Sequence, residues 1–188
     1  MQAATETTGS PAGAYWTICR RVYLVWAIIL LVGFVATHFF QRPSINGLWL
    51  ALSLAGIGYM VRQTSLPAFR RSGQAHLYYV GYVWVLVIGL GLLVSIATFV
   101  GRTALNPLAQ YLGIFWLIQM GLGHWLNGMV DPPRRPYWLT GGIQVAVGIL
   151  CLWVGLEVQF LVAGVVGAGA MALLIPLHPG QGQDVNKQ

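Results

Sequence analysis

The side chains that could support chemistry in this chain gather in one apolar segment beyond its midpoint. Gln119, His124 and Asn127 lie in a run of mostly apolar residues, and successive residues of a helix turn by about 100°. These three side chains therefore share one helical face, which we expect to look into the protein. Gln144 in the following segment lies at a depth comparable to that of His124 and is its expected partner.

The sequence leaves three uses of this polar face open. The first is interhelical hydrogen bonding that fixes the packing of a bundle. The second is a pocket for a lipid headgroup, a quinone or a pigment. The third is a path for water or ions through the membrane.

His124 is also the position where a pigment or haem would find an axial ligand. It lies about six residues, or ~9 Å, inside the predicted membrane boundary. His76 and His178 lie at that boundary and His38 lies at the other face, so no second histidine matches its depth. A bis-histidine haem is therefore not expected, whereas a single-histidine chlorophyll or haem is compatible with the sequence. We predict no resident cofactor and no metal site.

The acidic residues argue against an enzyme. Glu6, Asp131, Glu157 and Asp184 are the only four, and they lie in the tails or at the ends of apolar segments. The sequence contains no pair of carboxylates placed for acid–base catalysis, no two-cysteine metal motif and no glycine-rich phosphate loop. We therefore predict a non-catalytic protein.

The composition of the whole chain is that of a membrane protein. Of its 188 residues, 57% are hydrophobic and only 7% are charged, against roughly 25% charged in soluble domains. This excludes a soluble enzyme, a disordered regulator and a disulfide-stapled secreted domain. Charged residues, prolines and glycines divide the chain into six apolar segments, each near the ~20 residues that cross a bilayer. The segments are Val22–Phe40, Gly47–Val61, Leu77–Val100, Pro107–Val130, Tyr137–Leu156 and Val158–Leu177.

These segments predict an all-α integral membrane protein: a bundle of six transmembrane helices arranged as three hairpins. The six-span domain covers residues 22–177, between a polar tail (1–21) and a disordered tail (178–188). Only Glu157 separates the last two segments, so five spans is the alternative.

Basic residues favour one orientation of this bundle. Of the ten Lys and Arg, only Arg42 and Arg102 fall on the side away from the two termini. Basic residues concentrate on the cytoplasmic side, so we expect both termini there, in a cytoplasmic (inner or plasma) membrane. The charge of +6 thus reflects topology and attraction to lipid headgroups, not nucleic-acid binding. The expected face for headgroups or an acidic partner comprises Arg62, Arg70, Arg71, Arg134 and Arg135.

Small and aromatic residues suggest further packing features. Gly164, Gly167 and Ala168 would let a helix approach closely, either within the chain or against a membrane-protein partner or second copy. Aromatic belts are expected at the two membrane surfaces, near the basic side at Tyr78, Tyr79, Trp125, Tyr137 and Trp138 and near the other side at Trp49, Tyr111 and Trp153.

A short internal similarity links the first two hairpins. Ala36 and Thr37 before the first loop have counterparts in Ala97 and Thr98, about 60 residues later. Either the hairpins are a parallel repeat, or two loops draw on the same few residue types.

The function that these features predict is an accessory or scaffold subunit of a larger membrane assembly, binding membrane lipid and, within the bundle, a lipid, quinone or pigment. The alternative is a small-solute channel or facilitator lined by the polar face around Gln119 and His124.

Overall fold

The computed structural model describes residues 11–40, 42, 44–70, 78–99, 106–130 and 134–177. These residues form helices joined by short turns. The predicted tail 178–188 and Arg71 lie outside the described residues. The helices are α1 (Pro11–Phe39), α2 (Ile45–Thr64), α3 (Pro67–Arg70), α4 (Tyr78–Phe99), η2 (Asn106–Tyr111), α5 (Leu112–Val130), α6 (Arg134–Val154), η3 (Leu156–Val158) and α7 (Gln159–Leu177).

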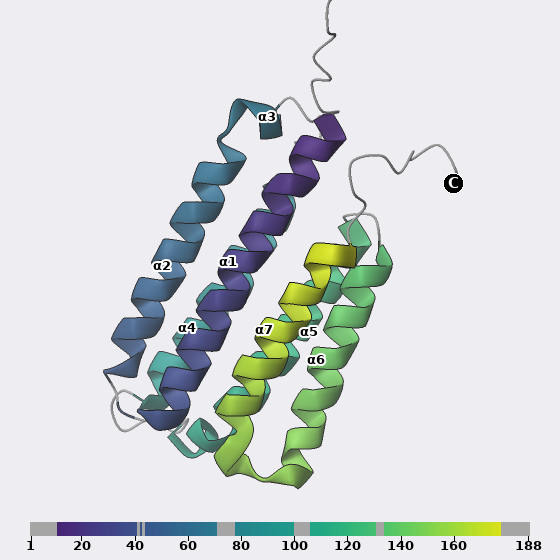
Figure 1. Cartoon of the computed structure of the whole chain (residues 1–188). Coiled ribbons are helices and arrows are strands. Elements are labelled where there is room, and N and C mark those ends of the chain that lie inside the picture. Colours follow the sequence, from purple (N-terminus) through teal and green to yellow (C-terminus); the bar gives the residue numbers. More distant parts are fainter. Residues whose placement is uncertain are drawn as a thin grey trace, which may run out of the picture.

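The long helices run roughly parallel to one another in a bundle (Figure 1). Packing contacts link α1 to α2, α2 to α4, α4 to α5, α5 to α6, α6 to α7 and α7 back to α1, so the six form a ring of three hairpins. α5 and α7, which are not neighbours in this ring, also contact each other across its interior. The predicted helical bundle is confirmed.

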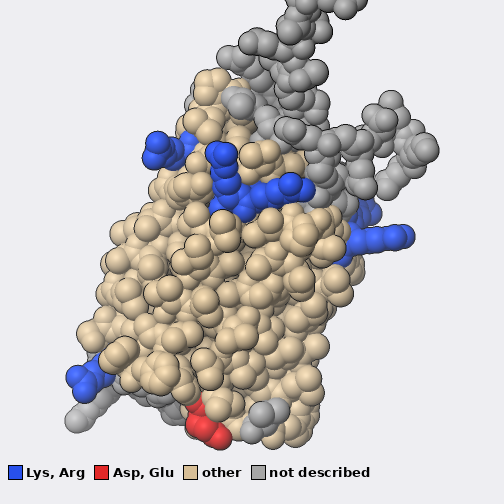
Figure 2. Space-filling view, in the orientation of Figure 1, with Lys and Arg blue, Asp and Glu red and all other residues tan. Residues whose placement is uncertain are grey.

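Five of the described helices, namely α1, α2, α4, α6 and α7, are long and apolar enough to cross a membrane. α5 has a similar length of 19 residues, but Gln119, His124 and Asn127 lower its hydropathy. Most of its residues face the interior, so neighbouring helices shield these polar side chains. Figure 2 shows charged side chains near the two ends of the molecule, with an uncharged belt between them on the face in view.

Two helices are longer than their predicted segments, and the predicted division between the last two segments is present. α1 begins at Pro11, because its first turns pack Tyr15 and Ile18 against Phe69 of α3. α2 extends over 20 residues and is longer than its apolar stretch. Gly155, whose φ of 131° suits glycine, interrupts the chain between α6 and α7. These two helices pack against each other, so they are not one long broken segment.

Two reciprocal tryptophan–glycine contacts join the helices of the first hairpin: each helix places a tryptophan against a glycine of the other. A Cβ on Gly56 of α2 would lie 2.8 Å from the indole of Trp26 on α1, and one on Gly33 of α1 would lie 2.6 Å from the indole of Trp49 on α2. The indole N–H of Trp49 donates to the Thr37 hydroxyl at 2.9 Å, and that hydroxyl donates to the Gly33 carbonyl at 2.7 Å. Glycine is required at both positions because the rings occupy the space of a side chain.

The second hairpin repeats this arrangement. Gly91 of α4 lies under the ring of Trp116 on α5, and Gly123 of α5 lies under the ring of Trp84 on α4. The indole N–H of Trp116 donates to the Ser95 hydroxyl at 3.0 Å, which in turn donates to the Gly91 carbonyl at 2.7 Å. Each tryptophan, glycine and hydroxyl group in these contacts of the first hairpin has an equivalent in the second.

The two hairpins are therefore a parallel repeat, as one of the two readings of the sequence proposed. The residue equivalent to Thr37 is Ser95, however, and not Thr98. In all four helices the tryptophan precedes its glycine by seven positions, which keeps both on one helical face. Trp49 and Trp116 meet across the repeat, stacked with ring centroids 5.8 Å apart and planes 9° apart.

Candidate ligand pocket and polar cluster

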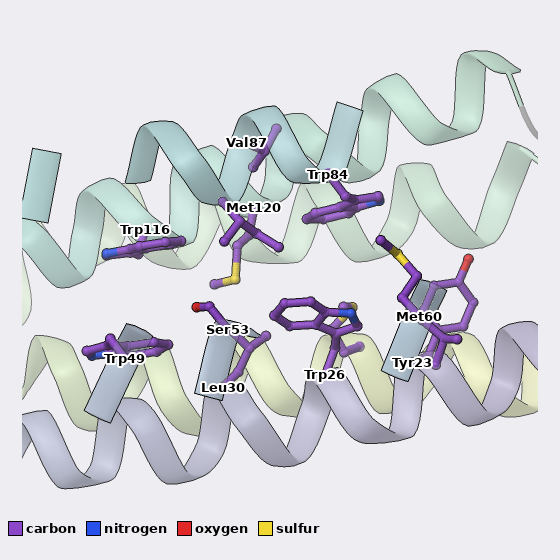
Figure 3. Close-up of a pocket in the computed structure, with 13 residues that line it drawn as sticks. Tyr23, Trp26, Leu30, Trp49, Ser53, Met60, Trp84, Val87, Trp116 and Met120 are labelled. Carbon is purple, nitrogen blue, oxygen red and sulfur yellow. The ribbon is translucent and has the colours of Figure 1, made fainter. Parts of the chain in front are cut away.

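A pocket lies between the two repeated hairpins, against α7 (Figure 3). Four pairs of its lining residues are equivalent in the repeat, so the pocket lies on the axis that relates the hairpins. These pairs are Trp26 with Trp84, Leu30 with Ile88, Trp49 with Trp116, and Ser53 with Met120. Val22, Tyr23, Met60, Val87 and Met171 complete the lining.

The pocket is narrow and almost wholly apolar. The stacked pair Trp49 and Trp116 lies toward one end, and Tyr23 and Met60 toward the other (Figure 3). The Tyr23 hydroxyl is already paired with the Tyr137 hydroxyl at 2.6 Å. The free volume is about 50 Å³, well below the ~150 Å³ dry cavity that accepts benzene. The space therefore suits part of a hydrocarbon chain better than a broad ring system.

One seam of the ring is looser than the others. α5 and α6 pack closely because the backbones of Gly121 and Gly141 are in contact. A Cβ on Gly121 would lie 2.7 Å from the Gly141 carbonyl oxygen, and a Cβ on Gly141 would lie 2.5 Å from the Gly121 carbonyl oxygen. α1 and α7 also pack extensively, whereas α2 and α4 pack much less so. Both α2 and α4 contribute to the pocket wall and carry outward-facing apolar residues such as Leu54 and Leu86. The wall between the pocket and the outer surface of the bundle is thus least closely packed at the α2–α4 seam.

His124 lies directly behind the pocket wall and is fully buried. Its Nδ1 is 2.9 Å from the Met120 carbonyl oxygen, and its Nε2 is 3.1 Å from the Met171 sulfur. The edge of its ring meets Trp84, with centroids 4.9 Å apart and planes at 70°. Met120, Met171 and Trp84 all line the pocket, so the three neighbours of His124 separate it from that space.

The structure brings Gln144 beside His124, as predicted. Gln144 is fully buried on α6 and lies next to the imidazole. Its Nε2 donates to the Gly167 carbonyl on α7 at 3.4 Å, while its Oε1 meets no hydrogen-bond partner in the part of the chain that the structure describes. Thr140, one turn earlier, donates to the Ala170 carbonyl at 3.3 Å. These contacts connect α5, α6 and α7 around the imidazole.

The other two members of the predicted polar face, Asn127 and Gln119, do not bond to His124 or Gln144 among the hydrogen bonds of the described residues. Asn127 is 1% exposed, and neither polar atom of its side chain has a hydrogen-bond partner among the described residues. Gln119 donates from Nε2 to the Val87 carbonyl of α4, away from His124. The helical wheel allows this separation, because Gln119 and His124 lie about 140° apart on α5.

The basic residues of the described chain concentrate at one end. Arg62 lies in the last turn of α2, and Arg134 and Arg135 begin α6. All three are exposed, at the end of the bundle where α1 begins (Figure 1). Arg70 closes α3 at this end, but its side chain is outside the description. Arg42 lies at the opposite end.

The small residues of α7 are buried within the chain. Gly164 packs against Phe34 and Leu31 of α1, and Gly167 packs against Met120 of α5. Ala168 is 8% exposed. In this chain the three residues pack helix against helix, and a partner contact through them stays a prediction.

The prediction of aromatic belts was wrong for two residues. Trp49 is 7% exposed and Tyr137 is fully buried, because each finds a hydrogen-bond partner inside the bundle. Reasoning from the sequence missed the pocket tryptophans as a set. The recurring seven-residue spacing from tryptophan to glycine was the signal that could have revealed them.

Among the described residues, no group of three or more His, Cys, Asp or Glu is placed to hold a metal ion. No family model matches the chain, and no curated protein or solved structure matches it significantly.

Proposed function

We propose that this protein is a lipid-binding accessory subunit of a membrane assembly, and that its pocket holds the hydrocarbon chain of a lipid or of a prenylated molecule such as a quinone. The observation that carries the proposal is the apolar pocket on the axis of the internal repeat. Binding sites of membrane proteins built from repeats commonly lie at the interface between the repeats.

The chemistry of the wall supports an apolar chain as the occupant. Four tryptophans and three methionines contribute to it, and methionine side chains adapt to irregular apolar shapes. A charged headgroup would lose its hydration there without a partner of opposite charge in the wall, which is costly. The ligand's chain therefore enters the pocket, and any charged group stays at the membrane surface.

The proposal includes six spans with both termini in the cytoplasm. α5 is the sixth span: its polar side chains face other helices, and its 19 residues extend for about 28 Å. Arg62, Arg134 and Arg135 favour the cytoplasmic side for their end of the bundle. The non-catalytic role rests on the sequence, whose acidic residues lie in tails or at segment ends.

We do not extend the proposal to a channel. His124 and Asn127, which belong to the predicted lining of a solute path, are buried. Gln119, which belongs to the same predicted lining, bonds to α4 instead. The observations thus favour packing and binding over conduction.

Photolabelling tests the pocket. The purified protein in lipid nanodiscs is exposed to hexadecyl methyl ether that carries a diazirine near the end of its chain, and labelled peptides are mapped by mass spectrometry. We expect labels on pocket residues such as Trp26 and Trp84. Ser53→Phe, which fills the wall at a residue 3% exposed, should remove them.

Ala55→Phe is the matched control, because Ala55 is exposed on the same helix. It should leave the labelling of the pocket unchanged. Labels confined to outward-facing residues such as Leu54 and Leu86, and insensitive to Ser53→Phe, would contradict the proposal.

A further inference from the structure

The hydrogen bonding of His124 fixes which of its nitrogens carries the proton. A carbonyl oxygen can only accept, so the contact of 2.9 Å with Met120 requires a proton on Nδ1. The neutral imidazole then has a bare lone pair on Nε2. That lone pair faces the Met171 sulfur at 3.1 Å, and a thioether has no proton to donate.

A second acceptor without a donor lies beside the first. Gln144 uses its amide N–H on the Gly167 carbonyl, and its Oε1, on a side chain that lies beside the imidazole, has no hydrogen-bond partner among the described residues. Buried polar atoms in proteins are nearly always hydrogen-bonded, and exceptions need an explanation. Here two buried acceptors, His124 Nε2 and Gln144 Oε1, share one need: a hydrogen-bond donor.

Of the three residues that lie between His124 and the pocket, Met171 is the one that faces Nε2. Met171 touches the imidazole with its sulfur and also lines the pocket. Its unbranched side chain can change rotamer at small cost. A rotation of Met171 would open the His124 nitrogen to whatever occupies the pocket.

We propose that the pocket selects a long-chain alcohol: a hydrocarbon chain whose terminal hydroxyl group donates a hydrogen bond to His124 Nε2, beside Gln144 Oε1, when the Met171 side chain changes rotamer. This rests on the proposed function, since the chain must first occupy the pocket. An uncharged hydroxyl group supplies the missing donor without the desolvation cost of a charge. An ether or ester of the same chain supplies none.

Competition against the photolabel tests this selectivity. Hexadecan-1-ol and hexadecyl methyl ether have the same chain and differ in the donor alone. An intramembrane hydrogen bond contributes about 1–2 kcal/mol, so the alcohol should displace the label at roughly tenfold lower mole fraction than the ether. Equal potency of the two would overturn the inference and leave the proposed function standing. If neither displaces the label from the pocket, the proposed function itself fails.

Variants assign the effect to the cluster. His124→Leu should abolish the tenfold preference while the ether competes as before. Ala55→Phe, at the exposed residue of α2 used as the control above, should leave the preference intact. A folded His124→Leu protein that keeps the full preference would refute the role of the imidazole.

Met171→Ala covers the case in which His124→Leu does not fold. It removes the thioether between pocket and imidazole, so we expect the preference for the alcohol to increase. An unchanged or smaller preference in that variant would overturn the proposed movement of Met171.

Discussion

The backbone contact between α5 and α6 makes two neighbouring glycines differ sharply in what they tolerate. A Cβ on Gly141 would lie 2.5 Å from the Gly121 carbonyl oxygen, whereas a Cβ on Gly142 meets nothing within 4 Å. The first distance is about 1 Å short of an ordinary nonbonded contact of ~3.5 Å. Backbone cannot rotate away as a side chain can, so Gly141→Ala must push the two helices apart.

The size of the effect follows from comparing the two variants. Replacing glycine by alanine within a helix stabilises by roughly 0.5–1 kcal/mol, and this gain is common to both. Overpacking a well-packed contact costs about 1–3 kcal/mol, and only Gly141→Ala incurs it. We therefore expect Gly141→Ala to be less stable than Gly142→Ala by about 1–3 kcal/mol, with Gly142→Ala at or above the wild type.

Reversible unfolding measures this difference. The purified proteins are titrated with sodium dodecyl sulfate in mixed micelles, and helical circular dichroism gives the free energy of unfolding. If the two variants unfold within about 0.5 kcal/mol of each other, a difference expected even for unrelated surface changes, then α5 and α6 do not meet at Gly121 and Gly141 as described.

Three further predictions follow from the packing and the charge distribution. Trp116→Phe removes the bond to Ser95 and should cost about 0.5–1.5 kcal/mol in the same assay, while Trp153→Phe, at a residue 73% exposed, should change stability by less than about 0.5 kcal/mol. Tyr137→Phe removes the buried bond to Tyr23 and should cost about 0.6–2 kcal/mol; an unchanged midpoint would show that the hydroxyl pair contributes nothing. A reporter active only in the cytoplasm should be active when fused to the C-terminus, and an inactive fusion of a stably expressed protein would contradict the six-span orientation.

The prediction of the helices from sequence succeeded where local physics decides. A chain with 7% charge and apolar runs of about 20 residues can satisfy its backbone within a bilayer only as helices. The ends of α4 and α7 followed the predicted segments closely for that reason. The start of α1 did not, because Pro11 to Arg21 is helical through contact with Phe69, a residue far along the chain.

The candidate site was predictable in part. The helical period correctly placed His124 and Asn127 inside the bundle, and depth alone suggested Gln144 as the partner of His124. The period could not separate Gln119 from them, since a helix facing several neighbours at once has more than one buried direction. The sequence prediction wrongly placed Trp49 at the membrane surface. A tryptophan near the end of an apolar segment fits an aromatic belt as well as a buried core.

The sequence by itself determined that this chain forms a bundle of apolar helices with its basic residues at one end, since these properties depend on residue types and their spacing. Tertiary structure alone decided that Met171, 47 positions beyond His124, faces its Nε2. It also decided that two tryptophan–glycine pairs lock each repeated hairpin and leave a pocket between them. Contacts between distant segments depend on how whole helices rotate and approach, and every neighbour in the bundle contributes to that choice.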